Sequence, residues 1–80
     1  MSKLSSSIKT RWVEQIKQRR IERGETQLVC SAKSGMSQQH WGAIESGRIS
    51  PKIETLERMG LAVGLRAEVV LERIIWGDKP

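Results

Sequence analysis

The sequence predicts an all-α fold, a compact domain of four to five helices followed by a C-terminal segment at residues 65–76 that favours a β-strand. The chain has 80 residues, which fits one domain. Apolar residues recur at helical spacing along it. A glycine follows each predicted helix, as is common at helix C-termini: Gly24, Gly35, Gly47 and Gly64. We expect a flexible polar arm at 1–7, the helical domain at 8–64 and a dimerisation segment at 65–80.

The first two helices are predicted from their apolar spacing and their end signals. One face of a helix from Ile8 to Arg23 carries the residues Ile8, Trp12, Val13 and Ile16. A second helix is expected from about Thr26 to Lys33, because Thr26 suits a helix start and the pair Ser34-Gly35 suits a helix end.

The third and fourth helices follow from similar signals. Ser37 is a good N-cap for a helix from Gln38 to Ser46. Pro51 is expected at or near the first position of a fourth helix, where proline is favoured. The tail is ambiguous, because residues 65–69 alternate like a strand whereas later apolar residues also fit a helix face; its many Val and Ile residues favour the strand.

The charge is concentrated at one end of the chain. The net charge is +5, and all of this excess lies before Gly24, since basic and acidic residues balance from residue 25 onward. Such a basic end suits a polyanion such as DNA, RNA or an anionic membrane, although it equally fits a solvated, solubilising helix face.

Several classes of site are not expected. A single cysteine, Cys30, allows no intrachain disulfide, and with the single His40 it cannot supply the roughly four ligands of a structural zinc site. We expect no cofactor, no small-molecule ligand, no membrane span and no signal peptide, hence a cytoplasmic, nucleoid-associated protein of a prokaryotic cell, phage or plasmid. No catalytic arrangement surrounds His40, so an enzyme is not expected.

The most informative stretch joins two short helices through the turn Ser34-Gly35-Met36-Ser37. This is the arrangement of a helix-turn-helix motif, whose second helix can enter a DNA major groove. The expected outer face of the helix 38–46 is polar and nearly uncharged, and it includes Gln38, Gln39, His40, Gly42, Ala43 and Ser46. Glutamine pairs donors and acceptors with adenine N6 and N7, so this surface favours base reading over purely electrostatic binding.

The same stretch resembles the lambda-repressor/Cro-like (XRE) helix-turn-helix family. The matching residues are Thr26-Gln27, Gly35-Met36-Ser37-Gln38-Gln39, Trp41, Ile44-Glu45-Ser46-Gly47-Arg48, Pro51 and Leu56, within residues 16–65. Several spaced matches carry more weight than one short motif. The sequence departs from the family at Cys30, Ser31 and Gly60, where the family usually has Leu, Ala and Ala, so we expect a thin core and modest monomer stability.

The resemblance implies roles by position. Base contacts are implied for Gln38, Gln39, His40 and Ala43. Phosphate contacts are implied for Thr26, Gln27, Ser37, Ser46, Arg48 and Lys52, and Gln27 also braces the helix 38–46. Arg20 and Glu45 are expected to form a partly buried structural ion pair. Trp12, Cys30 and Trp41 are interpreted as core residues.

The sequence therefore predicts a sequence-specific regulator of transcription that binds double-stranded DNA. We expect a repressor that binds an inverted-repeat operator as a homodimer. Antiparallel pairing of the tails of two copies, as in some antitoxin-type members of the family, is expected to use Ala67, Val69, Leu71 and Trp76. The alternative is an antitoxin that also binds a toxin protein and represses its own operon. A protein- or RNA-binding module is a further class, but the absence of Tyr and Phe disfavours an aromatic RNA platform.

Overall fold

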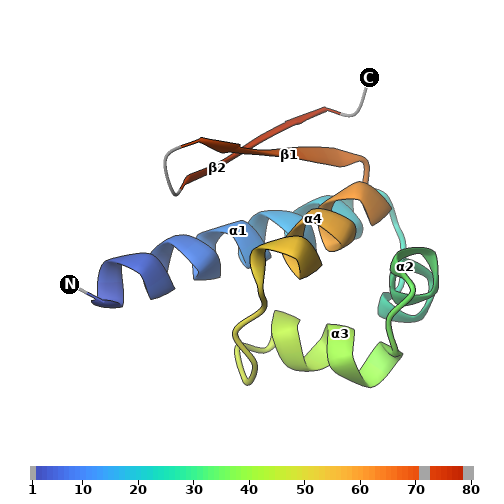
Figure 1. The fold of residues 1–80 in the computed structure, drawn as a ribbon. Coiled ribbons are helices and arrows are strands. Elements are labelled where there is room, and N and C mark those ends of the chain that lie inside the picture. Colours follow the sequence, from blue (N-terminus) through green and yellow to red (C-terminus); the bar gives the residue numbers. More distant parts are fainter. Residues whose placement is uncertain (1, 71–72, 79–80) are drawn as a thin grey trace.

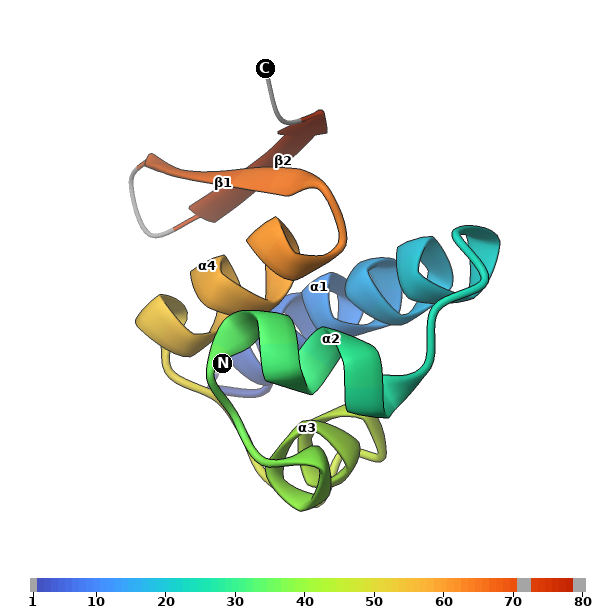
Figure 2. The same cartoon turned by 90° about the vertical axis from the view of Figure 1, so that its right-hand side faces the viewer.

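The computed structural model describes the backbone of residues 2–70 and 73–78 and the side chains of residues 9–65. The described side chains belong to an all-α bundle of four helices: α1 (Ser2–Glu22), α2 (Gln27–Ser34), α3 (Gln38–Glu45) and α4 (Ile53–Ala62). The backbone then continues as an antiparallel hairpin of β1 (Leu65–Val70) and β2 (Arg73–Asp78), in which Ala67 faces Trp76. Figures 1 and 2 place this hairpin and α3 on opposite sides of α1 and α4.

Helix α1 is longer than the sequence pattern predicts. It begins at Ser2, six residues before the predicted start at Ile8, and ends at Glu22. The segment 2–7 contains neither glycine nor proline, so nothing in it interrupts a helix that is anchored farther along by buried Trp12, Val13 and Ile16. The flexibility of this arm in solution stays a prediction.

The turn between α2 and α3 has the predicted glycine geometry. Gly35 has a φ of 73°, in the left-handed region, and the N–H of Met36 donates to the carbonyl of Ser31 at 2.9 Å. A hydrogen bond from an N–H to the carbonyl five residues earlier, together with a left-handed glycine, is typical of the Schellman motif that ends many helices. Ser37 then caps α3, because its Oγ accepts from the N–H of His40 at 3.0 Å. Gly35 and Ser37 therefore determine where α2 ends and where α3 begins.

The start of α4 differs slightly from the expectation. Lys52 is the N-cap, with φ −76° and ψ 162°, and the helix begins at Ile53. Pro51 therefore precedes the N-cap instead of occupying the first helical position, and it is buried. Because the backbone of Lys52 is extended, the helix begins two residues later than a start at Pro51.

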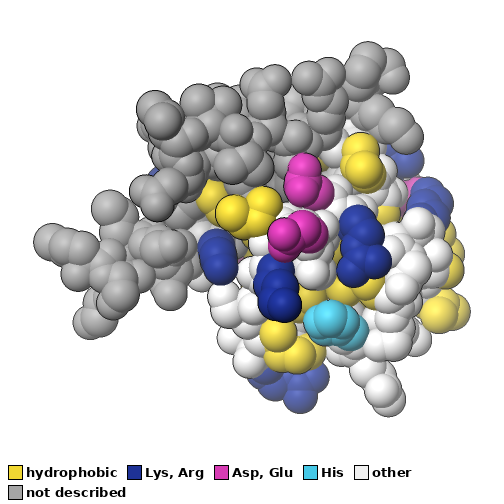
Figure 3. All heavy atoms as spheres, in the orientation of Figure 1, with side chains coloured by type: hydrophobic (Ala, Val, Ile, Leu, Met, Phe, Trp, Pro, Cys, Tyr) yellow, Lys and Arg dark blue, Asp and Glu magenta, His cyan; other side chains and the backbone are white. Residues whose placement is uncertain are grey.

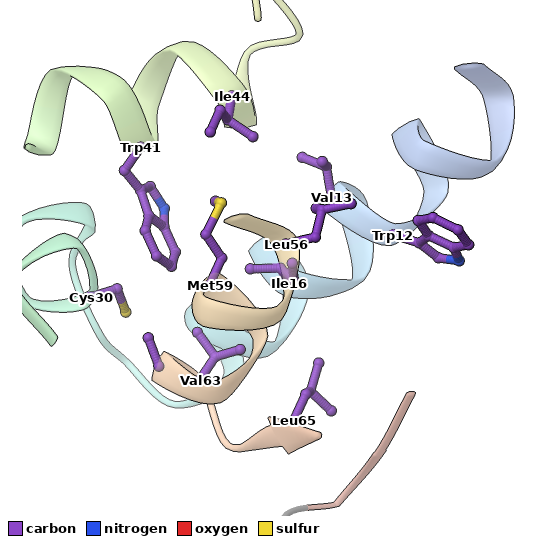
Figure 4. Close-up of a cluster of buried hydrophobic side chains, with 11 residues drawn as sticks. Trp12, Val13, Ile16, Cys30, Trp41, Ile44, Leu56, Met59, Val63 and Leu65 are labelled. Atoms are coloured by element: carbon purple, nitrogen blue, oxygen red, sulfur yellow. The ribbon is translucent and has the colours of Figure 1, made fainter. Parts of the chain in front are cut away.

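One hydrophobic core joins the helices. Ile16, Trp41, Leu56, Met59 and Val63 are almost completely buried, and Figure 4 shows their side chains converging between α1, α3 and α4. Cys30 and Leu65, the first residue of β1, belong to the same core, and Ser31 is buried as well. Burial raises the pKa of the Cys30 thiol to about 11, with the nearby Glu25 adding to the effect, so the thiol is protonated at neutral pH.

No helix within the described residues is long and apolar enough to cross a membrane.

Candidate nucleic-acid interface

The first turn of α3 presents three polar side chains to solvent. Gln38, Gln39 and His40 are all exposed, while Trp41 and Ile44 hold the opposite face of the helix in the core. We call these three exposed residues the α3 surface. Because α3 is capped by Ser37 and anchored by two fully buried side chains, the α3 surface is carried by a fixed helix end, as a reading surface requires.

Ala43 is buried, unlike the other three residues expected at bases. Ala43 is only 6% exposed and belongs to the buried residues, so its methyl group is not presented for a base contact. The chain turns back directly after α3, where the N–H groups of Arg48 and Ile49 both donate to the backbone carbonyl of Ala43, at 2.9 and 3.3 Å. The outer face of α3 is therefore narrower than the sequence pattern indicates.

Gly42 also lies away from the α3 surface. A Cβ atom built on Gly42 would lie 3.2 Å from Oε1 of Gln27, so this position faces α2. The glycine allows the side chain of Gln27 to pass close to the backbone of α3.

The residues expected at phosphates lie at the ends of the helices. Five of them are exposed: Thr26, Ser37, Ser46, Arg48 and Lys52. Thr26 caps α2 by accepting from the N–H of Val29 at 3.1 Å. Ser46 donates to the carbonyl of Ala43 at 3.1 Å and accepts from Nε of Arg48 at 3.3 Å, which draws the Arg48 side chain toward the C-terminal end of α3.

Gln27 is the exception among the expected phosphate ligands, because it is half-buried and points toward another residue. Its Nε2 donates to Oε1 of Glu45 at 2.9 Å. The bracing role implied for Gln27 is thus visible as a direct bond between α2 and α3.

Glu45 is the centre of a buried hydrogen-bond network. Its side chain is 2% exposed and its two oxygens accept from Arg20 in a bidentate pair, at 2.8 Å from Nε and 3.0 Å from Nη2. The indole N–H of Trp41 donates to the same carboxylate, as does Gln27. Arg20 also donates from Nη1 to the carbonyl of Glu25 at 2.9 Å. One carboxylate therefore links α1, α2 and α3.

The network changes the pKa values of both charged partners. Burial alone raises the pKa of Glu45, but the hydrogen bonds from Arg20, Trp41 and Gln27 outweigh that effect and leave the pKa below its ordinary value of 4.5. The hydrogen bond to Glu45 raises the pKa of Arg20. Both side chains are therefore charged at neutral pH. In that state their mutual attraction and hydrogen bonds offset the free-energy cost of removing the two charges from water.

A second charged cluster, not anticipated from the sequence, fixes the connection between α1 and α2. Glu25 forms ion pairs with Lys33 at 2.5 Å and with Arg23 at 3.2 Å. The bond from Lys33, followed by that from Arg23, lowers the pKa of the Glu25 carboxyl. The spacing of Glu25 and Lys33 gives no helical signal because Glu25 lies before α2.

Among the side chains that the structure describes, basic and acidic residues are scattered over the face that carries α3 and α4 and form no continuous basic patch (Figure 3). A binding mode on this face would therefore depend on individual contacts more than on a broad electrostatic field.

The side chains of the residues expected at the dimer interface are outside the described part of the structure. The backbone positions of Ala67, Val69 and Trp76 belong to the hairpin, but their side chains are not described. Leu71 lies outside the described residues altogether.

Replacing Glu45 tests the network. We expect Glu45→Gln to destabilise the fold at pH 7 by up to about 3–5 kcal/mol, because the buried Arg20 charge loses its partner. The pKa of Glu45 is lowered by folding, so its contribution is present above about pH 4.5 and is lost as the pH falls through the lower folded pKa. The difference between the wild type and Glu45→Gln should therefore shrink in acid.

Urea unfolding of both proteins between pH 7 and pH 2.5 measures this difference, and Glu14→Gln on the exposed side of α1 is the matched control. A difference that is independent of pH, or an equal loss in the control, would contradict the assignment.

Comparison with protein families identifies the domain. A family model described as a helix-turn-helix domain matches residues 13–74, most of the chain. The comparisons with curated proteins and with solved structures returned no significant match. The match covers the Glu45 network, the glycine turn and the α3 surface, and it is consistent with an XRE-like family, whose members are typically not enzymes. The chain therefore belongs to the helix-turn-helix domain family of DNA-binding regulators.

Proposed function

We propose that this protein is a sequence-specific repressor that binds double-stranded DNA with α3 in the major groove. The observation that carries the proposal is the α3 surface: three exposed polar side chains, without an acidic residue, on the first turn of a helix that is anchored by its buried face. The N-terminal residues of a recognition helix are those that meet base edges in this mode of docking.

Gln38 and Gln39 read bases in this proposal. Each amide offers a donor and an acceptor that match N7 and N6 of adenine. His40 lies beside them and contacts a base edge. Ala43 has no part in the reading, because it is buried.

Phosphate contacts hold α3 in register. Thr26 and Ser37 lie at the N-termini of α2 and α3, where helix dipoles and free N–H groups favour an anion. Ser46, Arg48 and Lys52 follow α3 and supply a hydroxyl and two cations from its other end. Gln27 contributes by holding α3 against α2 through Glu45.

The protein acts as a homodimer through its C-terminal segment in this proposal. The described sheet has two strands, so each strand has a hydrogen-bonded neighbour on one side only. A free strand edge is a template for pairing with a second copy. The hairpin lies on the side of the helices opposite α3 (Figure 1), so pairing there leaves both α3 surfaces free for an inverted repeat with half-sites about 34 Å apart.

The antitoxin alternative adds a protein partner to the same DNA-binding surface. No contact among the described residues favours a toxin in particular, so we propose the repressor.

Gln38→Ala should weaken binding to the cognate site by about 1–3 kcal/mol and change binding to random duplex DNA little, because the lost contacts are to a base. Fluorescence anisotropy with both duplexes measures the two affinities. Glu22→Gln, exposed on α1, is a control that lies away from α3. Equal weakening on both duplexes would mean that Gln38 does not read sequence.

Arg48→Ala should weaken cognate and random DNA alike and reduce the slope of log K against log salt by about one. The reason is the loss of one phosphate contact. Titrations at several salt concentrations give the slope, and an effect limited to the cognate sequence would rule out the phosphate assignment.

Removing residues 66–80 should convert the dimer to a monomer. Leu65 is kept, because it is 7% exposed and part of the core. Sedimentation velocity at micromolar concentration measures the oligomeric state, and circular dichroism checks that the helices remain. A truncated chain that is folded and still dimeric would remove this segment from the interface.

A further inference from the structure

A groove runs between the C-terminal halves of α2 and α4. It is lined by Lys33 and Ser34 of α2 and by Arg58, Leu61 and Ala62 of α4, and its volume is about 320 Å³. Figure 2 shows these two helices side by side, with α3 below them. The groove is built from the later turns of α2 and α4 and includes no residue of the α3 surface, so it can be occupied while α3 contacts DNA.

The floor of the groove is formed by small side chains and its rim carries an exposed leucine. Ser34 and Ala62 are 7% and 8% exposed, whereas Leu61 is 46% exposed. The Ser34 hydroxyl donates to the carbonyl of Ser31 at 3.0 Å, so its polar group is already satisfied and the floor offers no unpaired donor. Such a surface favours an apolar side chain inserted beside Leu61.

Both ionisable residues of the groove are cations. Arg58 is exposed and forms no ion pair with any residue of the described part of the chain. Lys33 is half-exposed and shares Glu25 with Arg23, which leaves that three-residue cluster with a positive charge. No acidic residue lines the groove. Its charge therefore complements carboxylates.

We propose that this groove binds an acidic amphipathic segment of a protein partner. One apolar side chain of the segment packs between Leu61 and the floor, and carboxylates on either side face Arg58 and Lys33. A floor of small side chains between two cations fits such a protein segment better than DNA, because a phosphate backbone carries no apolar side chain that would cover Leu61. The site goes beyond DNA binding and links the regulator to another protein.

A titration of the ¹⁵N-labelled full chain tests the proposal. The probe is a synthetic helical peptide of leucine and glutamate residues, and the control peptide has glutamine in place of every glutamate. We expect the acidic peptide to shift the amide signals of the groove residues. Arg58→Glu and Leu61→Ser should each raise its Kd at least fivefold, whereas the matched control Arg11→Glu, exposed on α1, should leave it unchanged.

Four results would overturn the proposal: no shift with the acidic peptide, shifts centred on α1 or α3, equal binding of the glutamine peptide, or an equal loss in Arg11→Glu. Weaker DNA binding by Arg58→Glu would assign the groove to DNA instead, and a changed oligomeric state of Leu61→Ser would assign it to a second copy. Both substitutions are at exposed positions, and Arg58→Gln replaces Arg58→Glu if the latter perturbs the spectrum of the free protein.

Discussion

The arrangement of this domain depends on one buried carboxylate. Glu45 lies in the last turn of α3 and accepts hydrogen bonds from α1, from α2 and from its own helix, through Arg20, Gln27 and Trp41. The core of this small domain has little apolar area to specify how three helices cross. The Glu45 network helps to determine how these helices cross, because each hydrogen bond pairs a charged or polar group that would otherwise be buried without a partner.

The turn and cap residues before α3 and the Glu45 network at its end together position this helix. The left-handed Gly35 and the Ser37 cap set where α3 begins, and Glu45 fixes where it ends relative to α1. The α3 surface lies on the turn next to the cap, so its position follows from both constraints. This explains how a chain of 80 residues can hold α3 in a defined position against α1 and α2.

The sequence predicted the features that arise from local chemistry. The limits of α2 and α3 were predicted to within about one residue, because caps and glycines act over a few positions. The burial of Ala43, the contact of Gly42 with Gln27 and the late start of α4 were not predicted, since they depend on how the loop and helices pack. The groove between α2 and α4 joins residues about 25 positions apart, and no periodic pattern indicates it.

We propose that the α3 surface reads DNA sequence. Selection of bound duplexes from a random pool at about 150 mM salt, where non-specific electrostatic binding is weakened, tests it most directly. If α3 reads sequence in a homodimer, the selection recovers an inverted repeat with half-sites about one helical turn apart. Recovery of no motif would contradict it, and Gln38 and Gln39 would then be ordinary surface residues.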